Sequence, residues 1–395
     1  MCQWDSGPGG RVLVLGDYRQ TVTAIRSLAR AGYEVILGTD QPRSTTARSR
    51  YVSAVWTYDA SCAKRFLDEL EAYLKSERPD FVFVVGESQL RRLARDAGRF
   101  APLAAWANAP FDVVARCFDK RAMYELTPAL SIPTLPWRDF SDAEQWRQAA
   151  QEMGYPVVVK RKDSSAQVQE RKALICASPD ELDLFLADVR ADPDPDSLVL
   201  QKFGAGKRHN CHVAADGGEL VAYFQQKVIR TDELDDTGIG VAGVSVAPDP
   251  QLRDWCAALV KAVGYSGIGC IQFLVDPASG AASFLELNPR LDSTAALACR
   301  LGYDFPRLAV EIAARTHPAP LSTPYATGRH YHWVYGDLNA WRQGKVALPV
   351  LARSALRGCD LSFDWRDPLP GLHLFWRKFA EAARKRMHAP APKHA

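Results

Sequence analysis

Short apolar runs alternate with amphipathic stretches in the first hundred residues of the chain. Val12–Leu15 is an apolar run that ends at Gly16, and Thr21–Ala31 then carries apolar residues at helical spacing. Val35–Gly38 and Phe81–Val85 repeat the short apolar pattern. Strands that alternate with helices and are apolar on both faces form parallel sheets covered on both sides. We therefore predict an α/β (α+β) fold that opens with a parallel sheet.

The turn after the first strand tests whether this opening binds a dinucleotide. Gly16–Thr21 contains one glycine, whereas the dinucleotide fingerprint needs three for its tight turn and close phosphate approach. An α/β domain without a nucleotide is therefore favoured, and an NAD(P)-binding oxidoreductase is the last of the alternatives.

Length and charge set further limits. With 395 residues, the chain is too long for one core, so two or three domains are expected. A net charge of +3 is too small for a surface built to hold nucleic acid. Much of the positive charge lies at the end, where residues 377–395 hold six Lys or Arg and one Glu. Gly371–Met387 is predicted to be a helix that packs on the core, with contact to an anionic membrane or a partner as the alternative.

A cytoplasmic location is predicted. No apolar run approaches the roughly 20 residues of a membrane span, and Met1–Gly10 has no signal-peptide pattern. The nine cysteines include no CxxC pair and are predicted to be reduced thiols. His209 and His212, like His330 and His332, lack a nearby second pair of ligands, so structural roles are favoured over metal binding.

A hairpin carries the strongest signal for chemistry. Two strands are joined by a turn rich in Asp, Pro and Gly, which favours an antiparallel pair. Glu286 and Asn288 share a strand face, and a loop of residues 277–281 would place Gln272 opposite Glu286. One carboxylate and two amide oxygens are suitable ligands for Mg²⁺ beside phosphates, and Arg290 adds a fork that can hold a phosphate or carboxylate.

Two lysines precede this hairpin. Lys120 follows Asp119, and Lys160 ends the apolar run Pro156–Val159, where a charge is exposed at the end of a strand. Each alone is typical of a solvated surface. Together they predict point charges for a polyphosphate.

With these motifs the sequence resembles ATP-grasp ligases, especially the large subunit of carbamoyl-phosphate synthetase and a group of predicted ATP-grasp carboligases with a Rossmann-like front domain. The resemblance is carried by Arg26–Gly32, Ser49–Tyr51, Asp119–Lys120, Gly154–Lys160, Gly264–Gly267, Glu286–Arg290 and Arg366–Pro370.

The resemblance implies four segments. Residues 1–118 would form a Rossmann-like pre-ATP-grasp domain and residues 119–196 the small subdomain of the ATP-grasp fold. Residues 197–318 would form the large subdomain with the metal site. Residues 319–395 would be a C-terminal extension that ends in the basic helix.

The resemblance also assigns roles to residues. It implies Mg²⁺ (or Mn²⁺) ligands at Gln272, Glu286 and Asn288, phosphate-binding lysines at Lys120 and Lys160, and an adenine-binding hinge at Gln201, Lys202 and Phe203. The loop over the phosphates would use the side chains of Lys162, Ser164 and Ser165. Catalytic contacts to phosphate or substrate would come from Arg290, Lys227 and Arg230.

Two positions depart from the family pattern. Lys202 occupies a place where the family usually has an acid that meets the ribose. The loop after Lys160 lacks the usual glycines. Asp292, Ser293 and Thr294 follow Arg290, either to reach the acceptor or to cap a helix.

The implied function is an ATP- and Mg²⁺-dependent ligase that activates a carboxylate as an acyl phosphate, joins it to an amine or similar nucleophile, and releases ADP and phosphate. Its partners would be small molecules. A carboxylase that uses bicarbonate and biotin is a variant of this interpretation. A degenerate ATP-binding module without catalysis is the alternative that the two departures favour.

Overall fold

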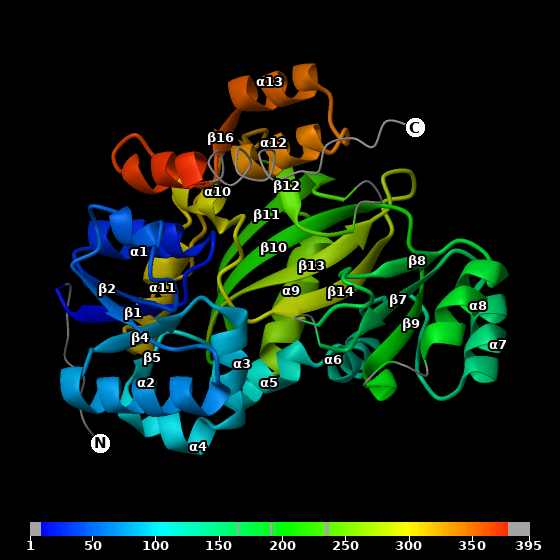
Figure 1. Ribbon diagram of the computed structural model, residues 1–395, viewed down its shortest axis with the longest axis horizontal. Helices are drawn as coiled ribbons and strands as arrows, with labels where there is room; N and C mark the ends of the chain where they lie inside the picture. Colours follow the sequence, from blue (N-terminus) through cyan, green and yellow to red (C-terminus); the bar gives the residue numbers. More distant parts are fainter. Residues whose placement is uncertain (1–8, 164–165, 190–191, 193, 234–236, 378–395) are drawn as a thin grey trace, which may run out of the picture.

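The computed structural model describes residues 9–163, 166–189, 192, 194–233 and 237–377. These residues form three sheets, and Figure 1 shows the largest of them lying between the other two. Among the described residues, no helix is both long and apolar enough to cross a membrane.

The first sheet has the strand order β3-β2-β1-β4-β5, and all its neighbouring strands are parallel. This confirms the predicted parallel sheet. Its strands are β1 (Arg11–Leu15), β2 (Glu34–Thr39), β3 (Ala54–Thr57), β4 (Phe81–Val84) and β5 (Ala105–Trp106). Its helices are α1 (Thr21–Arg30), α2 (Ala63–Glu77), α3 (Glu87–Arg95), α4 (Ala97–Phe100) and α5 (Phe111–Phe118).

The second sheet is antiparallel, with the order β6-β9-β7-β8. Its strands are β6 (Trp137–Asp139), β7 (Val157–Arg161), β8 (Leu174–Cys176) and β9 (Leu198–Lys202), and its helices are α7 (Ala143–Met153) and α8 (Pro179–Asp188). Both helices lie on the outer side of this sheet in Figure 1, where the buried Trp146 and Leu182 belong to one apolar core with Val157. Helix α6 (Lys120–Leu126) precedes this unit along the chain.

The third sheet has seven strands in the order β14-β13-β10-β11-β12-β15-β16. They are β10 (Lys207–Asp216), β11 (Glu219–Thr231), β12 (Gly240–Ser245), β13 (Gly267–Val275), β14 (Ala282–Asn288), β15 (His330–His332) and β16 (Gly358–Asp360). The helices of this part are α9 (Pro250–Ala262), α10 (Ala295–Arg300), α11 (Phe305–Ala313), α12 (Val334–Arg342) and α13 (Leu348–Arg357). Short 3₁₀ turns occur at Thr46–Arg48, Ala101–Leu103, Thr127–Leu130 and Pro195–Ser197.

Two helices cover opposite faces of the seven-stranded sheet. Helix α9 contacts β10 and β11, and its Leu252 and Leu259 join one core with Val213. Helix α11 contacts β10 and β13 and also α1 and β4 of the first sheet. Because α11 touches both sheets, it fixes the first sheet against the face of β10 that carries Ala214.

The segment predicted as a C-terminal extension also contributes to this sheet. Strand β15 pairs with β12, and β16 pairs with β15, so both strands extend the sheet beyond residue 318. Residues 369–377 are helical, in agreement with the start of the predicted basic helix. Residues 378–395, with most of the basic charge, lie outside the described residues. Contact of this tail with an anionic membrane stays a prediction.

A buried ion pair fixes the C-terminal segment to the first sheet. Arg26 Nε donates to Asp367 Oδ2 at 2.9 Å, and the two side chains are 6% and 1% exposed. Asp367 also accepts hydrogen bonds from Ser49 Oγ and the backbone N–H of Arg50. These contacts explain three of the sequence motifs, since Arg26, Ser49 and Asp367 all meet at one point.

We predict that Asp367→Asn weakens this attachment strongly. Removing one partner of a buried ion pair leaves the other charge uncompensated and costs about 3–5 kcal/mol. Urea unfolding followed by tryptophan fluorescence should show a transition at lower urea than in the parent chain. Asp183→Asn, in an exposed pair with Arg147, should shift the transition little. Equal shifts for the two variants would contradict a structural role for the buried pair.

Candidate functional site

A row of polar side chains crosses one face of the seven-stranded sheet. Glu286 on β14 lies opposite Gln272 on β13, as the sequence predicted. Gln272 lies opposite Asn210 on β10, and Asn210 lies opposite Gln226 on β11. Directly paired residues in an antiparallel sheet point to the same face. The four side chains therefore form a continuous polar row. The row lies on the same face of the sheet as Ala214, the face that α11 covers.

The Glu286 end of the row meets the predicted lysines. Asn288 Nδ2 donates to Glu286 Oε1 at 2.8 Å, and Lys120 Nζ lies 3.8 Å from Glu286 Oε2. Lys160 Nζ donates to the Tyr124 hydroxyl at 2.8 Å. Lys160 also donates to Gln201 Oε1 at 2.5 Å. The fold thus brings together two lysines, the hairpin ligands and Gln201 from four separate stretches of sequence.

Burial shapes the charges at this point. Desolvation lowers the pKa of Lys120, and it lowers that of Lys160 to about 8, although Glu286 opposes both shifts. Burial alone would raise the pKa of Glu286, but Lys120, the Asn288 hydrogen bond and Lys160 outweigh it, so the pKa is lowered. Two buried ammonium groups face one carboxylate, and this excess of positive charge suits an anionic ligand.

The hairpin side chains suit a hard divalent cation. Gln272 and Asn288 are buried, at 8% and 4% exposed, and both lie on strands that hold them beside Glu286. One carboxylate and two amide oxygens are typical ligands for Mg²⁺, which binds such oxygen donors together with phosphates.

Several predicted residues are not part of this group. Lys202 donates to the carbonyl oxygens of Gly154 and Tyr155, so its ammonium group is turned towards the loop before β7. Lys162 contacts Asp139 and the carbonyl oxygen of Asp196 within the small sheet. Phe203 makes a backbone bond to Pro156. Ser164 and Ser165 lie outside the described residues.

The two cations predicted on β11 also lie elsewhere. Lys227 pairs in register with His209, and because side chains alternate along a strand it faces away from the polar row that includes Gln226. Arg230 forms an ion pair with the buried Asp337 of α12 at 2.5 Å. The sequence could not show which face Arg230 takes, since β11 has register shifts between Val228 and Thr231.

Arg290 connects the sheet to the front of the molecule. Its Nη2 and Nε donate to Glu87 Oε2 at 2.7 and 3.0 Å, at the start of α3. Glu87 also accepts from Arg91, whose guanidinium lies 2.9 Å from Asp163, two residues after β7. Sequence reasoning missed Glu87. Glu87 could have been found from its position directly after the buried strand β4 and Gly86, because α/β sheets bind ligands at the carboxyl ends of their parallel strands.

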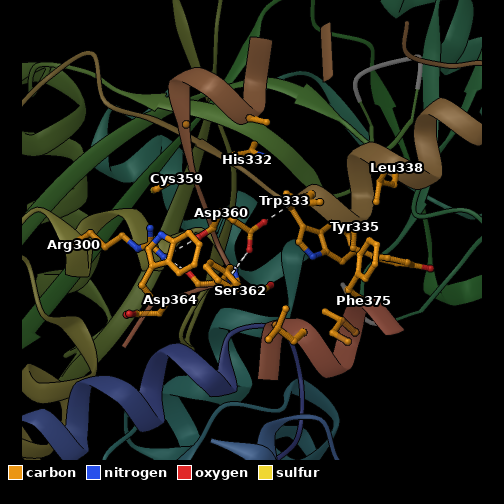
Figure 2. Close-up of a pocket in the computed structure, with 18 of the residues that line it drawn as sticks. Arg300, His332, Trp333, Tyr335, Leu338, Cys359, Asp360, Ser362, Asp364 and Phe375 are labelled. Atoms are coloured by element: carbon orange, nitrogen blue, oxygen red, sulfur yellow. Dashed lines mark hydrogen bonds between the residues drawn. The ribbon is translucent and has the colours of Figure 1, made fainter. Parts of the chain in front are cut away.

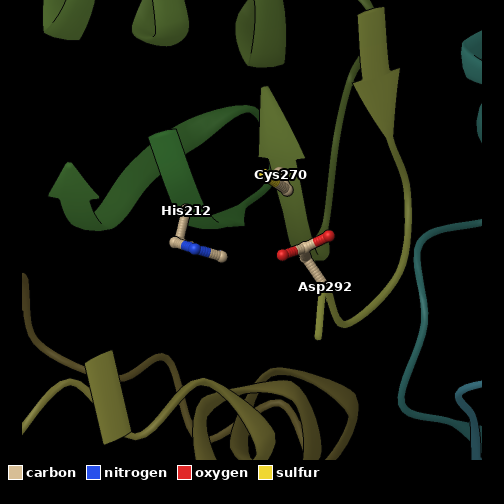
Figure 3. Close-up of side chains that lie close together, drawn as sticks. All are labelled: His212, Cys270 and Asp292. Carbon is tan, nitrogen blue, oxygen red and sulfur yellow. The ribbon is translucent and has the colours of Figure 1, made fainter. Parts of the chain in front are cut away.

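A polar cluster lies next to the row. His212, Cys270 and Asp292 bring one nitrogen, sulfur or oxygen atom each within 4.8 Å of one another (Figure 3). The nitrogen His212 Nε2 lies 2.8 Å from the Gln226 amide nitrogen and 3.3 Å from Thr294 Oγ1. Burial lowers the pKa of His212 to about 4 and raises the pKa of the Cys270 thiol. His212 is thus a neutral imidazole that is already hydrogen-bonded, and Cys270 is a protonated thiol. We therefore interpret the cluster as structural.

Thr294 and Arg19 close the far end of the row. Thr294 Oγ1 accepts hydrogen bonds from the amides of Asn210 and Gln226, and Asp292 accepts from the Thr294 backbone. Arg19, after β1, donates to Ser293 Oγ and stacks on Trp333 at 4.2 Å. Arg19 was not predicted from the sequence.

Four polar atoms around this end are buried and have no hydrogen-bond partner among the described residues. They are Asn210 Oδ1, Gln226 Oε1, Arg19 Nη1 and Arg208 Nε. Unsatisfied buried groups are costly, so such a group of donors and acceptors is typical of a place where a polar ligand or water completes the hydrogen bonds.

A family model described as carbamoyl-phosphate synthase L chain, ATP binding domain, matches residues 119–317, which is half of the chain. The chain belongs to this family of ATP-binding domains. The resemblance to ATP-grasp proteins is thereby confirmed.

Curated relatives agree with the family. The carbamoyl phosphate synthase large chain of Thermotoga sp. (strain RQ2) is 25% identical over 333 residues, which cover 77% of this chain and 29% of that protein. Chloroplastic biotin carboxylase 2 of Populus trichocarpa is 28% identical over 184 residues, or 44% of this chain and 34% of that protein. The chain thus spans less than a third of the length of the first relative.

Solved structures show the same fold. The biotin carboxylase domain of Hydrogenobacter thermophilus 2-oxoglutarate carboxylase superposes with a TM-score of 0.66 and 17% identity, over 81% of this chain and 73% of that one. The N5-carboxyaminoimidazole synthetase of Staphylococcus aureus superposes with a TM-score of 0.62 and 12% identity, over 81% and 80%. The likeness in fold to these two structures therefore extends over most of this chain.

The cluster of Figure 3 yields a test with thiol reagents. Iodoacetamide at pH 8 should modify the exposed Cys62, whose pKa is lowered by the backbone N–H groups of Arg65 and Lys64, well before the buried Cys270. Peptide mass spectrometry over time measures both rates, and alkylation in urea is the control that both thiols can react. Rapid labelling of Cys270 in urea-free buffer, especially labelling that added Zn²⁺ prevents, would contradict a closed structural cluster.

Proposed function

We propose that the chain is an ATP- and Mg²⁺-dependent ligase that activates a carboxylate as an acyl phosphate and joins it to an amine or similar nucleophile, releasing ADP and phosphate. The observation that carries the proposal is the placement of the partly buried Lys120 and Lys160 beside the carboxylate–amide group of Glu286 and Asn288. This arrangement combines cations for a polyphosphate with oxygen ligands for its metal.

Each residue of the group then has a distinct task. Lys120 and Lys160 hold the phosphates, and Gln272, Glu286 and Asn288 hold Mg²⁺, which when bound neutralises charge on the phosphoryl group. Arg290, oriented by Glu87, stabilises the transferred phosphate. Gln201 positions Lys160, and the adenine would lie near the end of β9. No covalent bond to the protein is needed, because positioning and charge supply the rate.

The far end of the polar row supports a site for the second substrate. Arg19 and Arg208 offer unused guanidinium donors, while Asn210 and Gln226 offer unused carbonyl acceptors. A substrate with both an anionic group and N–H or O–H donors satisfies this set. Bicarbonate is the first carboxylate to test, because the crystal structure of the Hydrogenobacter domain is a complex with MgADP and bicarbonate.

The three sheets support the proposed division of the chain, apart from the boundary at residue 196. We assign residues 1–118 to a Rossmann-like front domain on the basis of the strand order β3-β2-β1-β4-β5. Residues 119–196 and 197–318 would be the small and large ATP-grasp subdomains, except that β9 at Leu198–Lys202 pairs with β6 and β7, so the small sheet continues to residue 202. Residues 319–395 are the C-terminal extension, whose β15 and β16 are added to the large sheet.

The first prediction of this proposal concerns Glu286. In a product assay that separates ADP from AMP, run with bicarbonate and pooled carboxylates and amines, the parent chain should release ADP and phosphate only with acceptor present. Glu286→Gln should lower that rate at least about 100-fold, or about 2.7 kcal/mol, because the metal loses its charged ligand. Glu219→Gln, at an exposed carboxylate of β11, is the matched control and should keep the rate.

Three results would count against the proposal. Full turnover in Glu286→Gln would remove Glu286 from the metal site. AMP as product would exclude an acyl phosphate. Saturable ATP binding without turnover across the whole panel would favour the non-catalytic module instead.

The second prediction concerns the pKa of Lys160, which is about 8 in the free protein. A bound triphosphate favours the charged ammonium and raises this pKa, so ATP binding near pH 8–9 should take up protons. Affinity should be highest below pH 8 and should fall as pH rises through 8. Calorimetry in buffers of different ionisation heat measures the uptake.

Variants distinguish Lys160 from other lysines in the same titration. Lys160→Met should reduce both the proton uptake and the loss of affinity above pH 8. Lys261→Met, at an exposed lysine of α9, should leave both unchanged. Unaltered proton uptake in Lys160→Met would contradict direct contact between Lys160 and the phosphates.

A further inference from the structure

A cavity lies beside the C-terminal segment, apart from the lysine–carboxylate group. It has a volume of about 1200 Å³ and is bounded by β16, α12, the helix at residues 369–377 and Arg30 of α1. Figure 2 shows side chains that surround it, including Arg300, Trp333, Ser362 and Phe375. None of the proposed phosphate or metal residues lines it. Its volume is somewhat above the range of roughly 300–1,000 Å³ that is ordinary for ligand pockets.

The walls of this cavity are mainly aromatic and aliphatic. Five aromatic side chains contribute, from Trp333, Tyr335, Phe363, Trp365 and Phe375. Leucines at 338, 372 and 374 add aliphatic surface. Such walls gain free energy when they cover an apolar chain or ring system.

Large apolar side chains are also exposed around the cavity. Trp365 is 87% exposed, Phe375 48% and Leu372 46%, and all three line the cavity. A contiguous group of exposed apolar residues marks a binding surface more often than an inert one.

The charged groups of the lining leave an excess of positive charge. Asp360 accepts three backbone N–H bonds, from Val334, Ser362 and Phe363, and Asp364 is paired with Arg30 at 2.7 Å. Arg342 and Arg366 also line the cavity, and neither has an ion-pair partner among the described residues. Both acids are thus engaged while two guanidinium groups are not, and the cavity favours an anionic ligand over a cationic one.

Two residues of the lining also carry a buried polar atom without a hydrogen-bond partner in the described ranges. Ser362 is 8% exposed, and its Oγ has no hydrogen-bond partner within the described part of the chain. The same holds for Trp333 Nε1. Ser362 and Trp333 both line the cavity, as Figure 2 shows. A hydroxyl and an indole N–H can both donate to the oxygens of an anionic group.

We propose that this cavity binds an anionic amphiphile, a molecule with one apolar chain and one carboxylate or phosphate group. The apolar chain lies among the aromatic walls, and the anionic group lies near Arg342 and Arg366. This site adjoins the proposed ligase site at Trp333, whose ring stacks on Arg19, but it contains none of the described phosphate or metal residues, and the proposal does not depend on ATP chemistry.

Titration of the full chain with decanoate tests the proposal, followed by calorimetry below the micelle concentration. The expected result is saturable binding of one decanoate per chain, with decyltrimethylammonium and neutral decanol binding at least 10-fold more weakly. Decyl phosphate should bind as decanoate does, because the arginines recognise charge rather than one headgroup.

Matched variants locate the binding. Ala355→Trp places a large side chain into the lining from α13 and should weaken decanoate binding at least 10-fold, whereas Ala352→Trp on the same helix lies outside the lining and should not. Arg342→Gln combined with Arg366→Gln should remove the preference for decanoate over decanol, and Arg353→Gln is the control. Circular dichroism verifies the fold of each variant.

Each contrary result has a clear meaning. Equal binding of decanol and decanoate would show an apolar cavity without selection for an anion. Decanoate binding that Ala355→Trp leaves unchanged would place the ligand elsewhere. Binding that appears only after residues 378–395 are removed would show that the chain's own end competes for the cavity. Any of these results overturns the proposal.

Discussion

The burial of two ammonium groups beside a single carboxylate is the constraint on which the site depends. Lys120, Lys160 and Glu286 come from helix α6, strand β7 and strand β14, so the small and large sheets must meet for them to be neighbours. Desolvating charges is costly unless an opposite charge compensates. The two lysines and Glu286 therefore carry one excess positive charge, which the negative charges of a polyphosphate would compensate.

The first sheet also contributes side chains to the same site. Glu87 at the carboxyl end of β4 holds Arg290 of the large sheet, and Arg91 on the same helix reaches Asp163, two residues after β7 of the small sheet. These charge-assisted contacts join all three sheets around one point. At this carboxyl end of the parallel sheet, where other α/β proteins bind a ligand, Glu87 contacts protein side chains.

The hairpin was predictable because its geometry is local. A turn of known composition and the two-residue period of strands place Gln272 opposite Glu286, and the structure agrees. The face taken by Arg230 was not predictable, since a register shift in β11 after Val228 changes the alternation. Arg19 and Glu87 reach the site only through tertiary packing. Strands β15 and β16 are three residues long and lack an apolar run, so nothing in their sequence indicates a strand.

The central claim is that this group of charges activates a carboxylate through an acyl phosphate. Oxygen transfer tests it most directly. With a carboxylate substrate labelled with ¹⁸O and unlabelled ATP, the claim predicts that ³¹P NMR detects one ¹⁸O atom in each inorganic phosphate released with ADP. Phosphate that contains no label, in a reaction that forms the ligated product, would contradict it.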